Sequence, residues 1–143
     1  MTTKNKKLYL ISCSKTGSNK TTKAKDMYIS ELFRKSYAYA KNRNGDIFVL
    51  SAKYGLLDEN DVIEPYDETM NEKGKAKRVA WSESVAREIV KKYSPCVIVI
   101  LAGKSYYQYL KPMMESNGYT VELPLDGMGI GQRLKYLKEN INE

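Results

Sequence analysis

The sequence predicts a single α/β domain with about four mostly parallel strands and flanking helices. Its 143 residues suit one domain with one hydrophobic core. Three short apolar runs, which begin at Leu8, Ile47 and Val97, are typical of buried strands. The stretches between them contain apolar residues at helical spacing. Strands that alternate with helices in this way form a mostly parallel sheet with right-handed connections.

We expect the first strand at Leu8–Ile11, followed by a loop rich in Ser, Thr, Gly and Lys from Ser12 to Lys25. Asp26 is the expected N-cap of the first helix, which runs to about Arg43 and stops at Asn44-Gly45. The apolar stripe of this helix is expected to consist of Met27, Ile29, Leu32, Phe33, Tyr37 and Ala40.

The second strand is expected at Ile47–Leu50, followed by a long acidic loop from Ser51 to Met70. Loops of this length are usually functional or contain short helical turns. A second helix is predicted over roughly Glu72–Tyr93, and Pro95 lies just beyond its end. The residues expected to point inward from it are Val79, Val85, Ala86, Ile89 and Val90.

The clearest buried strand is Val97–Leu101, and a third helix follows it. Pro112 within that helix predicts a kink or a fresh helix start. A fourth strand is expected at Tyr119–Leu123. Three glycines then lead to a last helix over roughly Gln132–Asn140.

The residue inventory limits the chemistry that this chain can perform. It has no histidine, which excludes Ser-His and Cys-His nucleophile pairs and histidine-based zinc sites. Its two cysteines, Cys13 and Cys96, cannot form a four-thiolate zinc site, so we expect no metal. Few cysteines and no leader predict a cytoplasmic location, and no segment approaches the roughly 18 apolar residues of a membrane helix.

The net charge of +7 is unevenly distributed. Residues 1–25 contain seven lysines and no acid, so they account for the whole excess. Residues 57–70 contain six acids and no base. The basic segment indicates an anionic partner such as a phosphate or a nucleic acid; the alternative is a solvated segment that keeps the protein soluble. We expect residues 1–7 to be a frayed lead-in.

Ligands of open parallel sheets bind beyond the carboxyl ends of the strands. The segments 12–15, 51–56, 102–106 and 124–131 fall there, and all are rich in Ser, Gly, Lys or Tyr. Small residues and backbone amides suit a phosphate, and an aromatic ring suits a base. The expected ligand-binding residues are Ser12, Ser14, Lys15, Lys53, Tyr54, Gly103, Tyr106, Gly129 and Gln132.

None of these segments matches a common nucleotide-binding motif. The segment 12–15 lacks the Gly-Lys-Ser/Thr ending of a P-loop. Gly127, Gly129 and Gly131 follow the last strand rather than the first, and their spacing differs from Gly-x-Gly-x-x-Gly. The sequence therefore argues against an ordinary NAD site, and we expect no cofactor.

Two carboxylates are the candidate catalytic groups. Asp67 lies in the acidic loop, and Asp126 precedes the glycine-dense segment. Near a sugar, a carboxylate can stabilise an oxocarbenium-like centre or orient a water molecule. Asp67 can equally cap the following helix or pair with a lysine. Cys13 is a further candidate nucleophile, but a cysteine without a histidine partner is more often a buried apolar residue.

Six blocks between about Leu8 and Leu137 occur in a familiar order: LISCSKT, MYISELFRKSYAYA, VLSAKYGLL, IEPYDETM, LAGKSYYQYL and LPLDGMGIGQRLKYL. Together they resemble a family of small bacterial and phage domains of unknown function, often labelled as similar to the peroxide-stress protein YaaA. The resemblance implies a Rossmann-like fold. More loosely, it implies similarity to enzymes that act on nucleobases and nucleosides, including N-glycosidase and base-exchange types. It places the family's polar positions on Ser14, Lys15, Lys53, Tyr54, Tyr66, Asp67, Tyr106 and Gln132.

We therefore expect a nucleotide- or nucleoside-processing enzyme, a hydrolase or transferase that cleaves or exchanges an N-glycosidic bond. Lysines and glycine amides would hold a phosphate, and Tyr54 or Tyr106 would stack the base. Asp67 or Asp126 would stabilise positive charge on the ribose or position a water molecule. The alternative is a non-catalytic module that binds nucleotides, or nucleic acid through residues 1–25. A third hypothesis is a redox or stress protein that works through Cys13.

Overall fold

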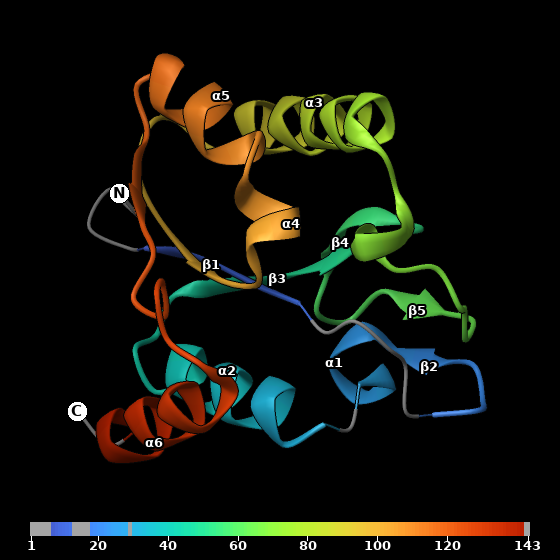
Figure 1. Cartoon of the computed structure of the whole chain (residues 1–143), viewed down its shortest axis with the longest axis vertical. Helices are drawn as coiled ribbons and strands as arrows, with labels where there is room; N and C mark the ends of the chain where they lie inside the picture. Colours follow the sequence, from blue (N-terminus) through green and yellow to red (C-terminus); the bar gives the residue numbers. More distant parts are fainter. Residues whose placement is uncertain (1–6, 13–17, 29, 142–143) are drawn as a thin grey trace.

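A five-stranded sheet forms the middle layer of the computed structural model (Figure 1), which describes residues 7–12, 18–28 and 30–141. The strand order is β4-β3-β1-β6-β7, in which the last four strands run parallel and β4 is antiparallel. The predicted Rossmann-like α/β fold with mostly parallel strands is therefore confirmed. The strand bounds are β1 Leu8–Ser12, β3 Asp46–Ser51, β4 Gly55–Asp58, β6 Val97–Leu101 and β7 Thr120–Glu122.

Helices cover both faces of the sheet, as Figure 1 shows. One face carries α2 (Glu31–Lys41) and α6 (Ile130–Asn140), and the other carries α3 (Lys75–Lys92) and α5 (Leu110–Ser116). A small two-stranded sheet and three short helical segments complete the described chain. Their bounds are β2 Thr22–Lys23, β5 Val62–Ile63, α1 Ala24–Met27, α4 Lys104–Tyr107 and the 3-10 helix η1 Met70–Glu72.

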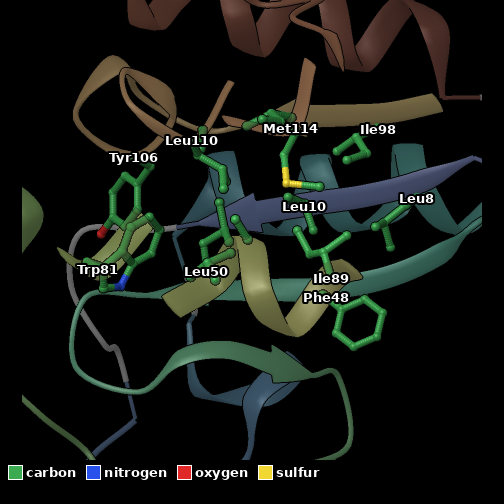
Figure 2. Packing of buried hydrophobic residues seen from close by; sticks show 14 of the residues in the cluster. Leu8, Leu10, Phe48, Leu50, Trp81, Ile89, Ile98, Tyr106, Leu110 and Met114 are labelled. Atoms are coloured by element: carbon green, nitrogen blue, oxygen red, sulfur yellow. The ribbon is translucent and has the colours of Figure 1, made fainter. Parts of the chain in front are cut away.

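The central strand β1 is buried on both faces, which explains its continuous apolar run. Side chains alternate across a strand, so Leu8 and Leu10 pack toward α3 and α5. Tyr9 and Ile11 pack toward α2 and α6. Figure 2 shows the first of these two cores, in which Leu10 meets side chains from both neighbouring strands and both helices.

The prediction that Asp26 caps one long first helix is wrong. The chain forms two helices, and the N-cap of α2 is Ser30, whose hydroxyl accepts a hydrogen bond from the Phe33 amide at 3.2 Å. The first backbone amides of α1 donate to the carbonyls of Asp61 and Glu59, which ties the start of α1 to the acidic loop, and the backbone is extended at Tyr28 before α2 begins. Contacts with a segment distant in sequence therefore fix the start of α1.

The expected loop from Ser51 to Met70 contains two strands and ends in η1. Gly55 has a φ of +80°, and with Ser51 it closes a tight hairpin that pairs β4 with β3. The Ser51 hydroxyl accepts hydrogen bonds from the amides of Lys53 and Tyr54, at 3.2 and 2.9 Å. The acidic segment is thus folded against the domain along much of its length.

The buried face of α3 differs in part from the prediction. Val85, Ala86 and Ile89 are buried as expected, but Val90 is 47% exposed, because it lies one residue beyond the buried face at Ile89. Trp81 joins the core and donates its indole N–H to the Ser51 carbonyl at 2.8 Å.

The helix after β6 is divided, as Pro112 predicted. A fresh helix, α5, starts at Leu110 and places Pro112 in its first turn, where a missing amide proton is tolerated. The last helix, α6, begins at Ile130, two residues earlier than expected, with Gly129 as its N-cap. This earlier start determines which α6 side chains face the sheet edge.

Candidate functional site

The strand order places a topological switch point beside β1. From β1 the chain first crosses to β3 on one side, and it later places β6 on the other side of β1. Because the connections leave β1 in opposite directions, a crevice opens beyond the carboxyl ends of β1 and β6. The residues at this crevice are Ser12, where β1 ends, and Ala102-Gly103, which follow β6.

A cleft of about 420 Å³ lies at this position. Its volume falls within the range of roughly 300–1,000 Å³ that is usual for small-molecule sites. Polar side chains reach it from several elements, and these are Ser12, Ser30, Asn71, Lys104, Ser105 and Arg133. The apolar part of the lining consists of Leu32, Leu101, Ala102, Leu125 and Ile130.

Among the described residues, the charged side chains that line the cleft are both cations. Lys104 is the first residue of α4 and is exposed, and Arg133 lies on α6 and is half-buried. Neither forms an ion pair within the described part of the chain. The Arg133 Nε donates to the Met128 carbonyl at 2.9 Å, which fixes the guanidinium group. No carboxylate of the described residues lines the cleft, so its charge favours an anionic ligand.

Three of the predicted ligand-binding residues line this cleft: Ser12, Gly103 and Tyr106. The Tyr106 side chain is only 5% exposed, and its ring lies edge-on to Trp81 with centroids 5.7 Å apart (Figure 2). The Tyr106 ring therefore packs in the core and forms part of the wall of the cleft. Ser14 and Lys15, together with Cys13, lie outside the described residues.

Two further predicted residues, Gly129 and Gln132, shape the start of α6. The Gly129 amide donates to the Gln132 side-chain oxygen at 2.9 Å, which caps the helix. This contact engages the Gln132 carboxamide locally. Neither residue is part of the cleft lining, although Ile130 between them is.

The strand-end pair Lys53 and Tyr54 lies apart from the cleft. The β3–β4 hairpin directs these residues toward the acidic segment, where the Tyr54 ring meets the Tyr66 ring edge-on at 5.6 Å. The Lys53 ammonium lies 5.3 Å from the Tyr54 ring centroid. The structure thus groups these predicted residues with Tyr66 and not with Ser12 or Gly103.

A pair of phenols joins the acidic segment to the first helical segment. The hydroxyl groups of Tyr28 and Tyr66 are 2.5 Å apart, and Tyr28 is only 1% exposed. Burial raises the pKa of Tyr28 far above its ordinary value, and the neighbouring Tyr66 hydroxyl adds to the shift. Tyr28 therefore stays protonated at neutral pH and can share a hydrogen bond with the Tyr66 hydroxyl.

Asp126 is held by a tyrosine that the sequence reading did not select. The Tyr107 hydroxyl donates to an Asp126 carboxylate oxygen at 2.6 Å, and this hydrogen bond is the main reason that the pKa of Tyr107 is raised. The charge of Arg133 acts in the opposite direction on that pKa. Asp126 itself is exposed and does not line the cleft, although it directly follows the lining residue Leu125 in the chain.

Asp67, the other candidate catalytic residue, is exposed and is also absent from the lining. It forms no ion pair with any described residue. The neighbouring Glu68 pairs with Lys73 at 2.9 Å, and this hydrogen bond lowers the pKa of Glu68. The structure therefore does not bring Asp67 and Asp126 together at the cleft.

Sequence reasoning missed Lys104, Ile130, Arg133 and Tyr107. Lys104 directly follows the selected Gly103, so its proximity to a strand end was a usable signal. Ile130 was expected in the loop before the last helix, but α6 starts two residues earlier and includes it, whereas Arg133 was already inside the predicted helix. The side chains of α6 that line the cleft are Ile130 and Arg133. They are separated by three residues, which places both on one side of the helix.

Other classes of site find little support in the described residues. No group of three or more Cys, Asp or Glu side chains there is placed to hold a metal ion. Burial raises the pKa of the Cys96 thiol, so a reactive thiolate is disfavoured at this position. Within the same part of the chain, no helix combines the length and the apolar character that crossing a membrane requires.

The chain belongs to a family of unknown function, DUF6884, which matches residues 8–139. The expected membership of such a family is thus confirmed over nearly the whole chain. No curated protein matches the sequence.

Proposed function

Since this family is not assigned an activity, we propose from the site itself that the protein binds a phosphate-bearing nucleoside at the switch-point cleft. We further propose that it cleaves or exchanges the N-glycosidic bond of this ligand. The observation that carries the proposal is a cleft of about 420 Å³ lined by Lys104 and Arg133, which have no carboxylate partner among the described residues.

Charge and hydrogen-bonding groups support the phosphate-binding half of the proposal. Lys104 supplies a compact, mobile cation, whereas Arg133 presents a planar guanidinium group that suits phosphate oxygens. The hydroxyl of Ser105 and the backbone around Gly103 lie in the same lining. An anionic ligand would therefore meet donors from both walls of the cleft.

The shape of the cleft favours a small molecule over a polymer. Its volume suits one mononucleotide, and apolar side chains such as Leu32 and Leu125 line part of it. A site for an extended strand instead consists of a basic groove with successive aromatic platforms. The aromatic ring that lines this cleft, Tyr106, is packed in the core.

Asp126 is the carboxylate that we retain for the chemical step. In hydrolysis a water oxygen bonds to the anomeric carbon, the bond to the base nitrogen breaks, and the base leaves with a proton from the water. A carboxylate near the ribose stabilises the positive charge that develops in this step or orients the water. The hydrogen bond from Tyr107 orients the Asp126 carboxylate, and Asp126 directly follows the lining residue Leu125 in the chain.

Binding is tested first, by thermal stabilisation with nucleosides, nucleotides, ADP-ribose-type molecules and short oligonucleotides. A ligand at 100 times its Kd adds about 2.7 kcal/mol to the free energy of unfolding. We expect Lys104→Ala and Arg133→Ala each to weaken nucleotide binding at least tenfold, since a hydrogen bond to a charged group contributes about 1.5–3 kcal/mol. Lys135→Ala and Arg87→Ala, which change exposed cations outside the lining, are the matched controls.

Turnover is then followed by chromatography of each stabilising ligand. We expect Asp126→Asn to abolish release of the base while binding persists, and Tyr107→Phe to lower it. Asp67→Asn is measured in parallel. If both Asp→Asn variants release the base like the wild type, the proposed role of these carboxylates is wrong. If the wild type leaves every stabilising ligand unchanged, the glycosidic reaction is wrong and the protein is a binding module.

Nucleic acid is the competing partner, because residues 1–25 hold the whole excess of positive charge. Stabilisation by oligonucleotides alone, with an affinity that falls steeply with salt, would replace the mononucleotide proposal. Retained oligonucleotide binding in Arg133→Ala would place that contact outside the cleft.

A further inference from the structure

We infer that Ile130 is a specificity-determining residue, which with Leu32 forms an apolar slot for the flat base of a nucleotide. Lys104 and Arg133 then bind the phosphate of the same molecule. This inference rests on the proposed nucleotide binding, which it narrows from a phosphate-bearing ligand to one that must carry a base.

The first observation is the unusual position of Ile130. It is the first residue of α6 and is 64% exposed, and it belongs to neither core cluster. Four large apolar side chains of the described residues are more than one third exposed, namely Tyr54, Val62, Val90 and Ile130. Ile130 is the one among them that lines the cleft. Its apolar surface is therefore available to a ligand and contributes little to packing.

The second observation is another apolar side chain in the same lining. Leu32 lies in the first turn of α2 and is half-buried, packed on one side against the core. Its remaining surface lines the same cleft as Ile130. A flat ring between two aliphatic side chains loses water from both of its faces, which is the main source of favourable free energy for such a group.

The third observation is the spacing of an apolar and a cationic side chain along α6. Ile130 and Arg133 are three residues apart on one helix, so their Cβ atoms lie roughly 5–6 Å from each other. An apolar contact and a cation are thus adjacent on one wall. This arrangement matches a nucleotide, in which a ribose separates the base from the phosphate.

The chemistry of the lining also disfavours a plain sugar phosphate. Hydroxyl groups of a sugar placed against Leu32 and Ile130 would lose hydrogen bonds to water without replacement. A base presents its polar groups at its edge instead, where the Asn71 carboxamide, which lines the cleft, offers both a donor and an acceptor. The ligand class that fits is a nucleoside phosphate.

The test is calorimetric titration of a nucleoside 5′-monophosphate and of ribose 5-phosphate, which has the same sugar and phosphate but no base. Wild-type protein is expected to bind the nucleotide more tightly. Ile130→Ala should weaken nucleotide binding about tenfold, because each buried methylene changes affinity roughly fourfold and Ile130 would be covered on one side only. The same variant should leave the affinity for ribose 5-phosphate unchanged.

Two variants complete the experiment. Val62→Ala removes an equally exposed aliphatic side chain, 66% exposed and outside the cleft, and should change neither affinity. Ile130→Leu keeps the apolar volume and should retain most of the nucleotide affinity. Far-UV circular dichroism of each variant verifies the fold before titration.

The possible outcomes distinguish failure of the proposed base slot from failure of the proposed function. If the wild type binds nucleotides and Ile130→Ala binds them equally well, the slot is wrong while the proposed function stands. Equal binding of ribose 5-phosphate and nucleotide by the wild type, or equal weakening of both by Ile130→Ala, also overturns the slot. If the wild type binds neither ligand, the proposed function fails and the inference fails with it.

Discussion

Removal of single hydroxyl groups from Tyr28 and Tyr66 tests whether the acidic segment is held on the domain. The two hydroxyls, 2.5 Å apart, join the residue after α1 to the segment between β5 and η1. Tyr28→Phe and Tyr66→Phe keep both rings, including the packing of Tyr28 on Phe33 with centroids 4.9 Å apart. Each variant therefore removes the hydrogen bond with little change in buried apolar area.

The expected magnitude follows from the burial of the group that loses its partner. A buried hydroxyl left without a partner costs about 1–3 kcal/mol. Tyr66 is half-buried and accessible to water, while Tyr28 keeps an interaction with the Ser51 side chain, so we expect about 1 kcal/mol for each variant. With 143 residues and an unfolding entropy of about 2.1 cal/mol/K per residue, this is a fall in Tm of roughly 3 °C.

The assay is urea denaturation of both single variants and the double variant, which forms a double-mutant cycle. Since one hydrogen bond is lost in all three, the double variant should cost about 1–1.5 kcal/mol rather than the sum of the singles. Tyr109→Phe is the control, because the Tyr109 hydroxyl has no hydrogen-bond partner in the described part of the chain. Strictly additive effects, or losses no larger than the control, would show that this pair does not hold the acidic segment.

Three further predictions concern the framework of the site. Gly45→Ala should lower the free energy of unfolding by about 1–3 kcal/mol in urea denaturation, because a Cβ there would overlap the Tyr9 ring and lie 2.6 Å from the Lys7 carbonyl oxygen. Ser30→Ala should cost about 1 kcal/mol through loss of the α2 cap, and Ser30→Asp should restore most of it; an unchanged midpoint would contradict the capping role. The free energy of unfolding should fall as pH rises above about 10, by about 1.4 kcal/mol per pH unit for each tyrosine that is ionised in the unfolded chain and protonated in the folded protein. Below that pH these tyrosines should not change it. The sign follows because burial raises the pKa of Tyr28, Tyr39 and Tyr93, so the unfolded chain releases phenol protons that the folded chain keeps; equal urea midpoints at pH 9 and pH 11 would refute it.

Most of the fold could be predicted because the buried strands are short apolar runs with helical stretches between them. Val97–Leu101 and Leu8–Ile11 are covered on both faces, so no charged side chain interrupts these apolar runs. The elements that were missed depend on contacts between distant segments. β4 has only four residues and forms by pairing with β3, and the first amides of α1, those of Ala24 and Lys25, bond to carbonyls of the acidic loop.

The site was predictable to the level of the sheet edge but not to the level of individual side chains. Ser12 and Gly103 were found because they directly follow parallel strands that flank the switch point. Lys53 and Tyr54 also follow a parallel strand, yet the hairpin to β4 turns them away from the cleft. Lys104 and Arg133 could not be singled out among 24 basic residues without the register of the helices that carry them.

Aliphatic side chains, where an aromatic ring was expected to stack on the base, have a consequence for base recognition. The ring of Tyr106 packs on Trp81, so under our proposal the base contacts Leu32 and Ile130 instead. Aliphatic side chains cover a purine or a pyrimidine without distinguishing their polar edges. Discrimination between bases must then come from hydrogen bonds at the base edge, because a group left unpaired there costs more than a changed apolar contact. Among the lining residues, Asn71 is the side chain whose carboxamide can provide that selection.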